Sequence, residues 1–300
     1  MRLTRFAPSP TGHLHLGHVV NAIYVWGLAR TLGARVLLRV EDHDRIRSRP
    51  EFERAILADL AWLGFVPDEG LMPLRRQSEN NAAYESALAR LQDTLNVYVC
   101  DCSRKEIARL CASPAPPERG GDWYPGRCRD RRLRRGESVP AGAGIRVQLD
   151  ESAESFHDLA LGEITQTPAD QCGDLLLRDR DGNWTYQFAV TVDDMNDGVD
   201  LVIRGLDLLA STGRQIKLAR MLGRHRPPAF FHHPLVIKPD GEKLSKASGD
   251  TGIQELRGAG ASPAEVVGLA AASAGIVVAG TVLDADTAGR LIGVRTRGHD

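Results

Sequence analysis

The chain has 300 residues, of which 42% are hydrophobic and 26% charged, and its formal net charge is −1. This composition is typical of a globular protein with a sizeable core, and no apolar run is long enough to span a membrane. The near-zero charge excludes a general attraction to nucleic acid, so an RNA partner would need a local basic patch. Met1 leads into a predicted strand without a targeting leader, so we expect a cytoplasmic protein. We also expect a monomer whose five cysteines are thiols or metal ligands rather than disulfides.

The first predicted unit reads RFAPSPTGHLHLGH and runs from Arg5 to His18. Residues 5–7 close a short strand, residues 8–12 form a stiff turn, and an amphipathic helix follows over 19–32. A strand, a turn and a helix N-terminus in this order bring backbone N–H groups and the positive end of the helix dipole together. The unit therefore predicts a phosphate site.

Two histidines stand at the start of this helix. Helical spacing puts His15 and His18 on one face, and Gly17 between them would let a flat ring approach the backbone. The alternative is a surface turn with two solvated histidines.

An alternation of strands and helices follows. The apolar strand 34–40 ends in the acidic residue Glu41, and the segments 50–65 and 81–95 have helical spacing. Strand–helix–strand order predicts an α/β fold with a Rossmann-like parallel sheet, in which Glu41 lies at the ligand-binding edge. Further strands are predicted at 144–149, 175–178, 186–192, 200–204 and 230–237, and further helices at 211–222 and 263–274.

The pattern breaks where three of the cysteines cluster. Cys100, Cys102 and Cys128 with Tyr124 could give three thiolates and a phenolate around a zinc ion, which would staple a loop-rich region. Cys111 is a rival fourth ligand, a site of three cysteines without Tyr124 is conceivable, and free thiols are the alternative to any metal.

A dense basic run follows the cysteines. Residues 127–135 hold six arginines in nine positions. Such a run is either a solvated face or a patch that binds a phosphate backbone.

A polar loop rich in lysine is predicted at 239–250, with the sequence PDGEKLSKASGD. Its two amines, on Lys243 and Lys246, could close over phosphates and neutralise charge that grows in a transition state. Alone, such a loop is more often ordinary surface. We predict four segments: a first half of the sheet domain over 1–97, an inserted zinc-bearing α/β module over 98–172, a second half over 173–250, and a short helical C-terminal region over 251–300.

Taken together, RFAPSPTGHLHLGH and EKLSK resemble the two signature motifs of the class I aminoacyl-tRNA synthetases. The stretches RFAPSPTG, VEDHD, YQFAVTVDD and VIRGLDLLAST resemble the glutamyl-tRNA synthetase catalytic domain over roughly 3–250. The resemblance implies that ATP and Mg²⁺ are used to convert glutamate to glutamyl-adenylate. Positioning and charge do most of the work in such chemistry. One departure is Ala247, where the family motif usually ends in Ser.

The resemblance also implies residue roles. His15, His18, Lys243 and Lys246 would be catalytic, and the ATP site would comprise Pro10, Gly12, His15, Gly17, His18 and Lys246. The glutamate pocket would comprise Arg5, Phe6, Ala7, Pro8, Ser9, Glu41, Tyr186 and Arg204. The residue chemistry agrees, because two guanidinium forks suit carboxylates, Glu41 suits the ammonium group and Tyr186 offers a phenol donor.

Only fifty residues follow Asp250, whereas full glutamyl-tRNA synthetases carry a long anticodon-reading region after the lysine loop. This resembles a shorter branch of the family, which activates glutamate without tRNA and transfers it to queuosine at the wobble position of tRNA(Asp). That branch has a zinc site with a tyrosine ligand, which the arrangement CDCSR…YPGRC resembles. The alternatives are a truncated ligase that charges another acceptor and a catalytically silent module that binds RNA.

Overall fold

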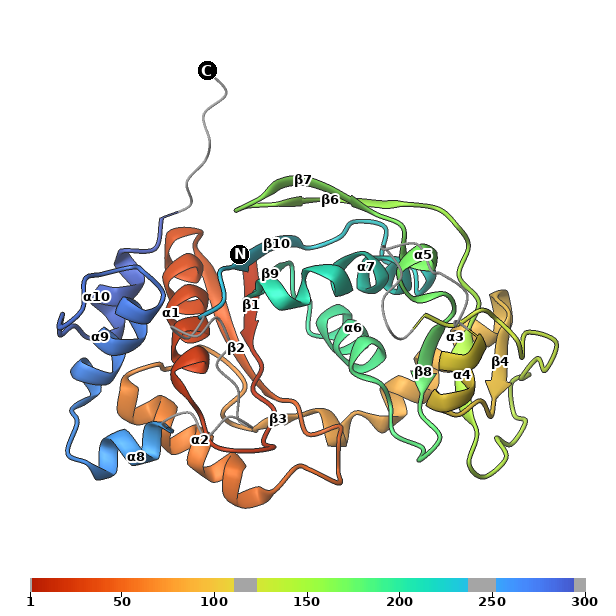
Figure 1. Ribbon diagram of the computed structural model, residues 1–300, viewed down its shortest axis with the longest axis horizontal. Coiled ribbons are helices and arrows are strands. Elements are labelled where there is room, and N and C mark those ends of the chain that lie inside the picture. Colours follow the sequence, from red (N-terminus) through yellow and green to blue (C-terminus); the bar gives the residue numbers. More distant parts are fainter. Residues whose placement is uncertain (1, 111–122, 237–251, 294–300) are drawn as a thin grey trace.

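The computed structural model describes residues 2–110, 123–236 and 252–293 (Figure 1). Lys243, Lys246 and Cys111 therefore lie outside the described residues. The strands are β1 (Arg2–Phe6), β2 (Ala34–Val40), β3 (Arg75–Arg76), β4 (Val97–Cys100), β5 (Gly144–Val147), β6 (Glu154–Asp158), β7 (Gly162–Gln166), β8 (Leu175–Arg178), β9 (Leu201–Gly205) and β10 (Ala229–His233). The helices are α1 (Leu16–Thr31), α2 (Pro50–Leu63), α3 (Asn81–Thr94), α4 (Arg104–Leu110), α5 (Pro168–Cys172), α6 (Tyr186–Asn196), α7 (Thr212–Met221), α8 (Ile253–Gly258), α9 (Pro263–Ser273) and α10 (Ala285–Arg290), with 3-10 turns η1 (Gln77–Glu79) and η2 (Leu206–Ser211).

The predicted parallel sheet is confirmed, in two abutting parts. In one part β1, β2 and β3 are parallel, and in the other β6, β10 and β9 are parallel with β7 added antiparallel. The parts meet where β1 lies alongside β9, and there Asp200 N donates to Leu3 O over 3.1 Å. The carboxyl ends of β1, β2 and β9 thus face one region, where ligands bind in open α/β sheets.

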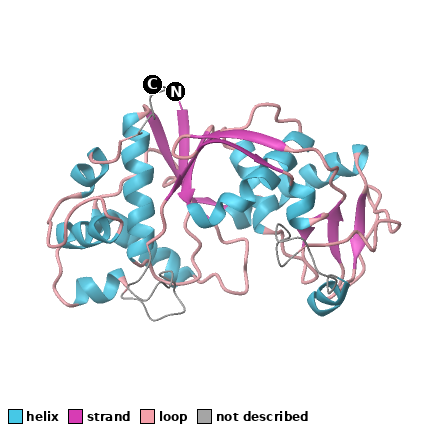
Figure 2. Ribbon diagram, turned by 45° about the horizontal axis from the view of Figure 1, so that its top comes forward, coloured by secondary structure: helices cyan, strands magenta, loops and turns pink. Residues whose placement is uncertain are grey.

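The helix after the first turn is buried on nearly all sides, so the predicted amphipathic face is wrong. The core of the molecule surrounds α1, because β1 and β2 lie on one side of it and α9 and α10 on the other (Figure 1). Gly27 makes the crossing with α10 possible, since a Cβ there would lie 2.5 Å from the carbonyl oxygen of Gly289. Helices crowd this end of the molecule, while antiparallel strands lie at the other end (Figure 2).

The stretch from Tyr186 to Val192 is helical, so the strand predicted at 186–192 is wrong. Tyr, Phe and Val alternate with other residues there, which is the pattern of a half-buried strand, but α6 is buried on almost every side from Phe188 to Asp194. A helix buried all round carries no polar stripe, and its sequence cannot be told from a strand by periodicity. The other predicted helices and strands are confirmed within a few residues.

The small antiparallel sheet, of order β4–β5–β8, does not follow the predicted segment boundaries. β8 pairs with β5 although it lies in the predicted second half of the sheet domain. Conversely, β6 and β7 lie within the predicted insertion but join the sheet of β9 and β10. Among the helices in the described ranges, none is both long and apolar enough to cross a membrane.

Candidate active site and metal centre

The two histidines after the first turn form one capped unit. His15 is the N-cap of α1, and its Nδ1 accepts from Gly17 N over 3.1 Å, while His18 Nδ1 accepts from His15 N over 3.1 Å. The ring centroids are 3.9 Å apart. Because both Nδ1 atoms accept, a neutral ring in either position carries its proton on Nε2. Two Nε2–H donors therefore belong to the positive end of α1, which suits an anion.

The glycine between them has a direct structural reason. A Cβ on Gly17 would lie 2.9 Å from Cε1 of His15, so a side chain there would push the His15 ring out of its capping position. The sequence predicted that Gly17 leaves room for a ligand ring. In the structure, the absence of a side chain at Gly17 first makes room for the His15 ring.

The described residues on either side of the lysine-rich segment both contact the start of α1. Before it, His233 stacks on Tyr24 with centroids 4.7 Å apart, and its Nε2 lies 3.0 Å from Asn21 Oδ1. After it, Ile253 N donates to Leu14 O over 3.0 Å. Both ends of that segment are thus anchored within two turns of the histidine pair.

The first turn is tied to the end of β2. Phe6 pairs with Leu38 in the parallel register, and beyond the strands Glu41 N donates to Pro8 O over 3.0 Å. Glu41 therefore lies beside the turn, as predicted. The Phe6 ring is buried against Trp26, so only its backbone can face a ligand at this edge.

Arg5 is held by a buried acidic residue of α6. Its Nε lies 3.1 Å from each carboxylate oxygen of Asp194, and Arg39 donates to the same carboxylate over 2.7 Å. Burial raises the pKa of Asp194, but the Arg5 and Arg39 guanidinium groups outweigh it and hold that pKa below its usual range. Arg39 is fully buried and also pairs with Asp197. This network orients Arg5 and balances its charge.

Arg204 is held by neutral acceptors. Its Nε donates to His232 Nε2 over 3.1 Å, and its terminal nitrogens donate to Gln215 Oε1 and Thr212 Oγ1 over 2.7 Å each. His232 Nδ1 lies 2.6 Å from an Asp158 oxygen, so the proton sits on Nδ1 and Nε2 is free to accept. Burial and the nearby guanidinium lower the pKa of His232 despite the Asp158 carboxylate.

Four of the five polar residues predicted for glutamate, Arg5, Glu41, Tyr186 and Arg204, share one electrostatic environment. Burial raises the pKa of the Tyr186 hydroxyl, as does the charge of Glu41, while Arg204 and Arg5 lower it. Burial also raises the pKa of Glu41, against the opposing charges of Arg39 and Arg5. The arrangement offers two cations, one carboxylate and a phenol, which are the groups that an amino acid with two carboxylates requires.

Several residues of the site were not predicted. Asp194 and His232 orient the two arginines, while Asp193 accepts from Gln77, Asn80 and Tyr84. The one signal in the sequence is a pair of acidic residues closing an apolar stretch, VTVDD, which indicates buried charge.

A cavity of about 860 Å³ opens beside Tyr186. It extends from the loop after β2, where His43 lines it, to the region around the cysteines, where Arg146 and Cys172 line it. Its wall also includes Arg47, Arg104 and Arg214. The wall also holds four aspartates, Asp44, Asp174, Asp179 and Asp181, against its four arginines. A group larger than an amino acid can approach Tyr186 from this side.

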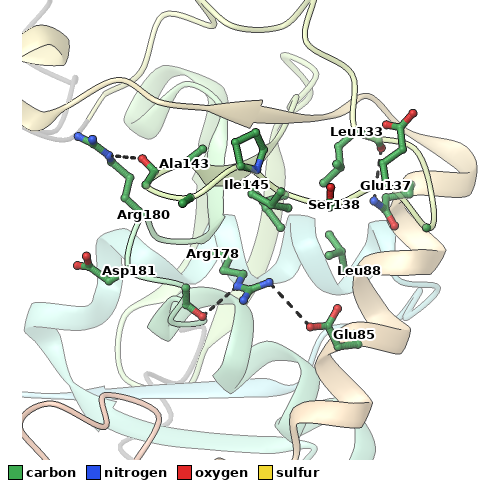
Figure 3. Close-up of a pocket in the computed structure, with 17 residues that line it drawn as sticks. Glu85, Leu88, Leu133, Glu137, Ser138, Ala143, Ile145, Arg178, Arg180 and Asp181 are labelled. Carbon is green, nitrogen blue, oxygen red and sulfur yellow. Dashed lines mark hydrogen bonds and ion pairs between the residues drawn. The ribbon is translucent and has the colours of Figure 1, made fainter.

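A second cavity, of about 620 Å³, lies between α3 and the loop before β5 (Figure 3). Arg178 crosses it, donating to Gly182 O over 2.9 Å and lying 4.0 Å from Glu85 (Figure 3). None of the predicted site residues lines it, whereas Tyr186 lines the larger cavity.

The cysteine cluster forms as predicted. The sulfur atoms of Cys100, Cys102 and Cys128 all lie within 4.8 Å of one another and are buried. The Tyr124 hydroxyl is 3.4 Å from the Cys100 sulfur and 3.8 Å from the Cys102 sulfur. With zinc–ligand distances of about 2.0–2.3 Å, neighbouring ligands of a tetrahedron are about 3.5–3.8 Å apart. These four donors therefore fit zinc.

The proposed ligands differ in how readily they ionise. Burial raises the pKa of Tyr124, and hydrogen bonds with the three cysteines raise that pKa further. Burial raises the pKa of Cys100, but hydrogen bonds with Tyr124 and the Cys102 backbone, together with Arg146, outweigh burial and leave that pKa lowered. Burial and the neighbouring thiols raise the pKa of Cys102 to about 11, although the Tyr124 hydrogen bond opposes them. Arg146 lies 3.9 Å from the centroid of the Tyr124 ring. Without a cation the cluster is a set of buried thiols that cannot all ionise together.

The basic run after the cluster is partly neutralised. Arg129 pairs with Asp174 over 2.8 Å, Arg131 with Asp101 over 2.7 Å, and Arg135 with Asp93 over 3.4 Å. Arg132 and Arg134 are exposed and form no ion pair within the described ranges. Only part of the run is available to a phosphate backbone.

This fold and this site define a class I aminoacyl-tRNA synthetase catalytic domain. The family described as tRNA synthetases class I (E and Q), catalytic domain, matches residues 2–273, and the chain belongs to it. A glutamate–tRNA synthetase structure from Elizabethkingia anophelis superposes with a TM-score of 0.75 at 26% identity, over 98% of this chain and 66% of that one.

Among curated proteins, the glutamyl-Q tRNA(Asp) synthetase of Symbiobacterium thermophilum is 42% identical over 91% of this chain and 86% of its own length. The one from Rhodobacter capsulatus is 38% identical over 88% of this chain and 98% of its own. The chain spans 54% of the glutamate–tRNA ligase of a Synechococcus strain, at 40% identity. Within the class, the chain belongs with the glutamyl-Q tRNA(Asp) synthetases.

Proposed function

We propose that this protein activates L-glutamate with ATP to glutamyl-adenylate in the absence of tRNA, and then transfers the glutamyl group to queuosine at the wobble position of tRNA(Asp). One observation carries the proposal: Arg5, Glu41, Tyr186 and Arg204 come from four parts of the chain and lie close enough to influence one another's charge at one edge of the sheet. The relatives named for this reaction match most of the chain.

In the activation step, the side-chain carboxylate of glutamate binds the Arg5 and Arg204 forks and Glu41 takes the ammonium group. The α-carboxylate is thereby aimed at the α-phosphate of ATP. Its oxygen attacks phosphorus, and pyrophosphate leaves with the electrons of the broken P–O bond. The Nε2–H groups of His15 and His18 hold phosphate oxygens at the N-terminus of α1. Magnesium, when bound with ATP, screens the phosphate charge.

Lys243 and Lys246 complete the proposed phosphate site. Their loop lies outside the described residues, but the anchors at His233 and Ile253 bring both of its ends to the start of α1. We propose that Lys246 holds the reacting phosphates and that Lys243 assists.

The acceptor is proposed to enter through the cavity beside Tyr186. Its volume of about 860 Å³ suits a nucleoside, and its arginines and aspartates offer hydrogen-bond donors and acceptors to a polar base. We further propose that Cys100, Cys102, Tyr124 and Cys128 hold a structural zinc ion. This ion would stabilise the wall of the cavity and take no part in the reaction.

Glutamate-dependent ATP–pyrophosphate exchange without tRNA tests the first step. We expect exchange with glutamate, and none with aspartate or glutamine. Lys246→Ala should reduce the exchange rate by about 10²–10³, the effect of losing one transition-state contact. No exchange in the wild-type protein would contradict activation and favour a silent RNA-binding module.

Transfer of labelled glutamate to tRNA(Asp) with and without queuosine tests the second step. We expect product only with the modified tRNA, and after ribonuclease cleavage we expect the label on the anticodon fragment and not on the 3′-terminal fragment. Transfer to the 3′ end, or to unmodified tRNA, would contradict queuosine as the acceptor and favour a ligase that charges another group.

A further inference from the structure

The loop after β2 carries a histidine at the mouth of the acceptor cavity that no step above uses. His43 lines the 860 Å³ cavity together with Tyr186, and their ring centroids are 6.3 Å apart. It follows Glu41 by two residues. It therefore lies between the amino-acid pocket and the space through which an acceptor would arrive.

A chain of hydrogen bonds fixes which nitrogen of His43 carries the proton. Asp193 accepts from Tyr84 over 2.8 Å and from Asn80 over 2.9 Å, and its carboxylate accepts from Gln77 Nε2 over 2.7 Å. The Gln77 amide therefore turns its oxygen toward His43 Nδ1, 2.7 Å away. An amide oxygen can only accept, so Nδ1 carries the proton and the Nε2 of neutral His43 has a lone pair.

These bonds also hold the ring in place. Gln77 is fully buried and Asp193 is 1% exposed, so the support of His43 cannot move without disrupting the core. No described residue bonds to Nε2. A base that is oriented through one nitrogen and open at the other is the arrangement that general-base catalysis requires.

We propose that His43 is the general base of glutamyl transfer, taking the proton of the attacking nucleoside hydroxyl on Nε2. The inference rests on the proposed function. In this step the hydroxyl oxygen forms an ester bond to the glutamyl carbonyl carbon, and its O–H bond breaks toward Nε2. The bond from that carbon to the adenylate oxygen breaks, and AMP leaves with the electron pair. His43 then returns the proton to solvent.

The position of the reacting carbon follows from glutamate itself. The ammonium group, assigned to Glu41, and the activated carbonyl are both attached to the α-carbon. A residue beside Glu41 is therefore near the reacting carbon, whereas Arg5 and Arg204 bind the far end of the substrate.

The other ionisable groups nearby are engaged or unsuited. Glu41 takes the ammonium group, and Asp44 accepts from Arg47 over 2.6 Å. Burial and the charge of Glu41 raise the pKa of Tyr186, so its phenol stays protonated and cannot act as a base. Arg45 donates to Ser78 O and is always charged. Of the other aspartates that line the cavity, Asp174 pairs with Arg129 over 2.8 Å, Asp179 accepts from Asn183 N over 2.8 Å, and Asp181 also lines the second cavity. Among the residues that line the cavity, His43 is the histidine, and its Nε2 has a lone pair to offer.

Single-turnover transfer from enzyme-bound glutamyl-adenylate to queuosine-containing tRNA(Asp) tests the proposal, with ATP–pyrophosphate exchange measured on the same preparations. The ratio of the two rates should fall by about 10²–10⁴ in His43→Ala and His43→Gln, the usual contribution of a general base. The control is His157→Gln, an exposed histidine on β6 that is 2.8 Å from Glu163, and its ratio should match that of the wild-type protein.

Two further readouts separate catalysis from structure. Added imidazole should restore transfer in His43→Ala but not in His43→Gln, because only alanine leaves room for the ring. The pH profile of transfer should differ between the wild-type protein and His43→Gln, because only the wild-type protein has a base at this position.

An unchanged ratio in both variants, with exchange intact, would overturn the role of His43 and leave the proposed function standing. Absence of glutamate-dependent exchange in the wild-type protein would instead overturn the proposed function. A reduced ratio without rescue and with the pH dependence retained would show that His43 only shapes the cavity, and would also overturn the proposal.

Discussion

Individual protons around the site are placed by neighbours that can only donate or only accept. Backbone N–H groups at the start of α1 leave the protons of neutral His15 and His18 on Nε2, and Asp158 draws the proton of His232 to Nδ1. The position of each proton decides whether the free ring nitrogen donates or accepts a hydrogen bond. His15 and His18 are donors for an anion, whereas His232 is an acceptor for the Arg204 guanidinium.

Arg204 donates a hydrogen bond to neutral His232, so the binding of glutamate by Arg204 should depend on pH. The pKa of His232 is lowered in the fold, so the unfolded chain, with an ordinary value of about 6.5, binds more protons just below that pH. The stabilising effect of neutral His232 is therefore complete above about pH 6.5 and is lost as the pH falls through the folded value. The charges facing the ring are Asp158, Arg204 and Asp207. We expect the glutamate KM in pyrophosphate exchange to rise on acidification.

Two substitutions check this at pH 8. In His232→Gln an amide oxygen can still accept from Arg204, so KM should change by a few-fold at most and lose part of its pH dependence. His232→Leu removes the acceptor, and KM should rise about 10- to 100-fold, since a hydrogen bond to a charged group contributes about 1.5–3 kcal/mol. Equal KM values for the two variants would contradict the role of His232.

The sequence could predict the residues that touch a ligand but not those that support them. Arg5, Glu41 and Arg204 lie within recognisable stretches and carry the chemistry that an amino acid needs. The partners Asp194 and Asp158 are 189 residues from Arg5 and 74 residues from His232, respectively, and no local pattern encodes such distances.

Among the elements, the crossing of α1 and α10 depends on the absence of side chains. A Cβ on Gly27 would lie 2.5 Å from the Gly289 carbonyl oxygen, and backbone cannot move aside as a side chain can. Gly27→Ala should therefore lower the free energy of unfolding by about 1–3 kcal/mol, the usual cost of overpacking. Gly258→Ala is the control, because nothing lies within 4 Å of its Cβ position. Chemical denaturation should show the control to be neutral or slightly stabilising.

The cysteine cluster gives a second prediction at this level. Cys128→Ser should abolish the binding of about one equivalent of zinc, because it removes a thiolate from the set of four donors. Cys172→Ser is the matched control, since Cys172 is buried outside the cluster with its sulfur 3.2 Å from Pro168 O. Metal analysis of both variants and of the wild-type protein measures their zinc content and tests this prediction. Zinc in none of them, or retained in Cys128→Ser, would contradict the site.

Periodic elements were predictable because their pattern is local. The regularly spaced helices α2, α3 and α9 were predicted to within about two residues. α6 was not, because a helix buried on all sides shows the alternation of a strand when β-branched residues fill it. The burial of α1 could not be predicted either, because the helices that cover it, α9 and α10, come from the far end of the chain.

Considered as a whole, the molecule is nearly neutral, and its positive charge is local. Arg132 and Arg134 are exposed without an ion pair in the described chain, whereas Arg135 lies 3.4 Å from Asp93. If the tRNA backbone contacts this run, Arg132→Gln and Arg134→Gln should each weaken tRNA binding and reduce the salt slope by about 0.7–0.9. Arg135→Gln should have less effect. Filter binding between 50 and 200 mM salt measures this, and unchanged slopes would show the run to be a solvated face.

The α/β class and the parallel pairing of the first strands were also predictable, because strand–helix–strand order leaves few topologies. The sequence could not predict which sheet β6 and β8 would join. β6 joins β10 and β8 joins β5 across the segment boundaries drawn from composition. Pairing of distant segments is decided by tertiary packing, which composition does not record.

The placement of the β6–β7 hairpin limits how this enzyme can be re-engineered. A designer who wished to alter its choice of RNA would naturally excise residues 98–172 or graft a foreign module in their place. That operation would also delete Asp158, the anchor of His232, and Gln166, which accepts from Gly213 N at the start of α7. If Arg204 binds glutamate as proposed, the chimera would bind the amino acid more weakly unless the graft left 154–166 in place.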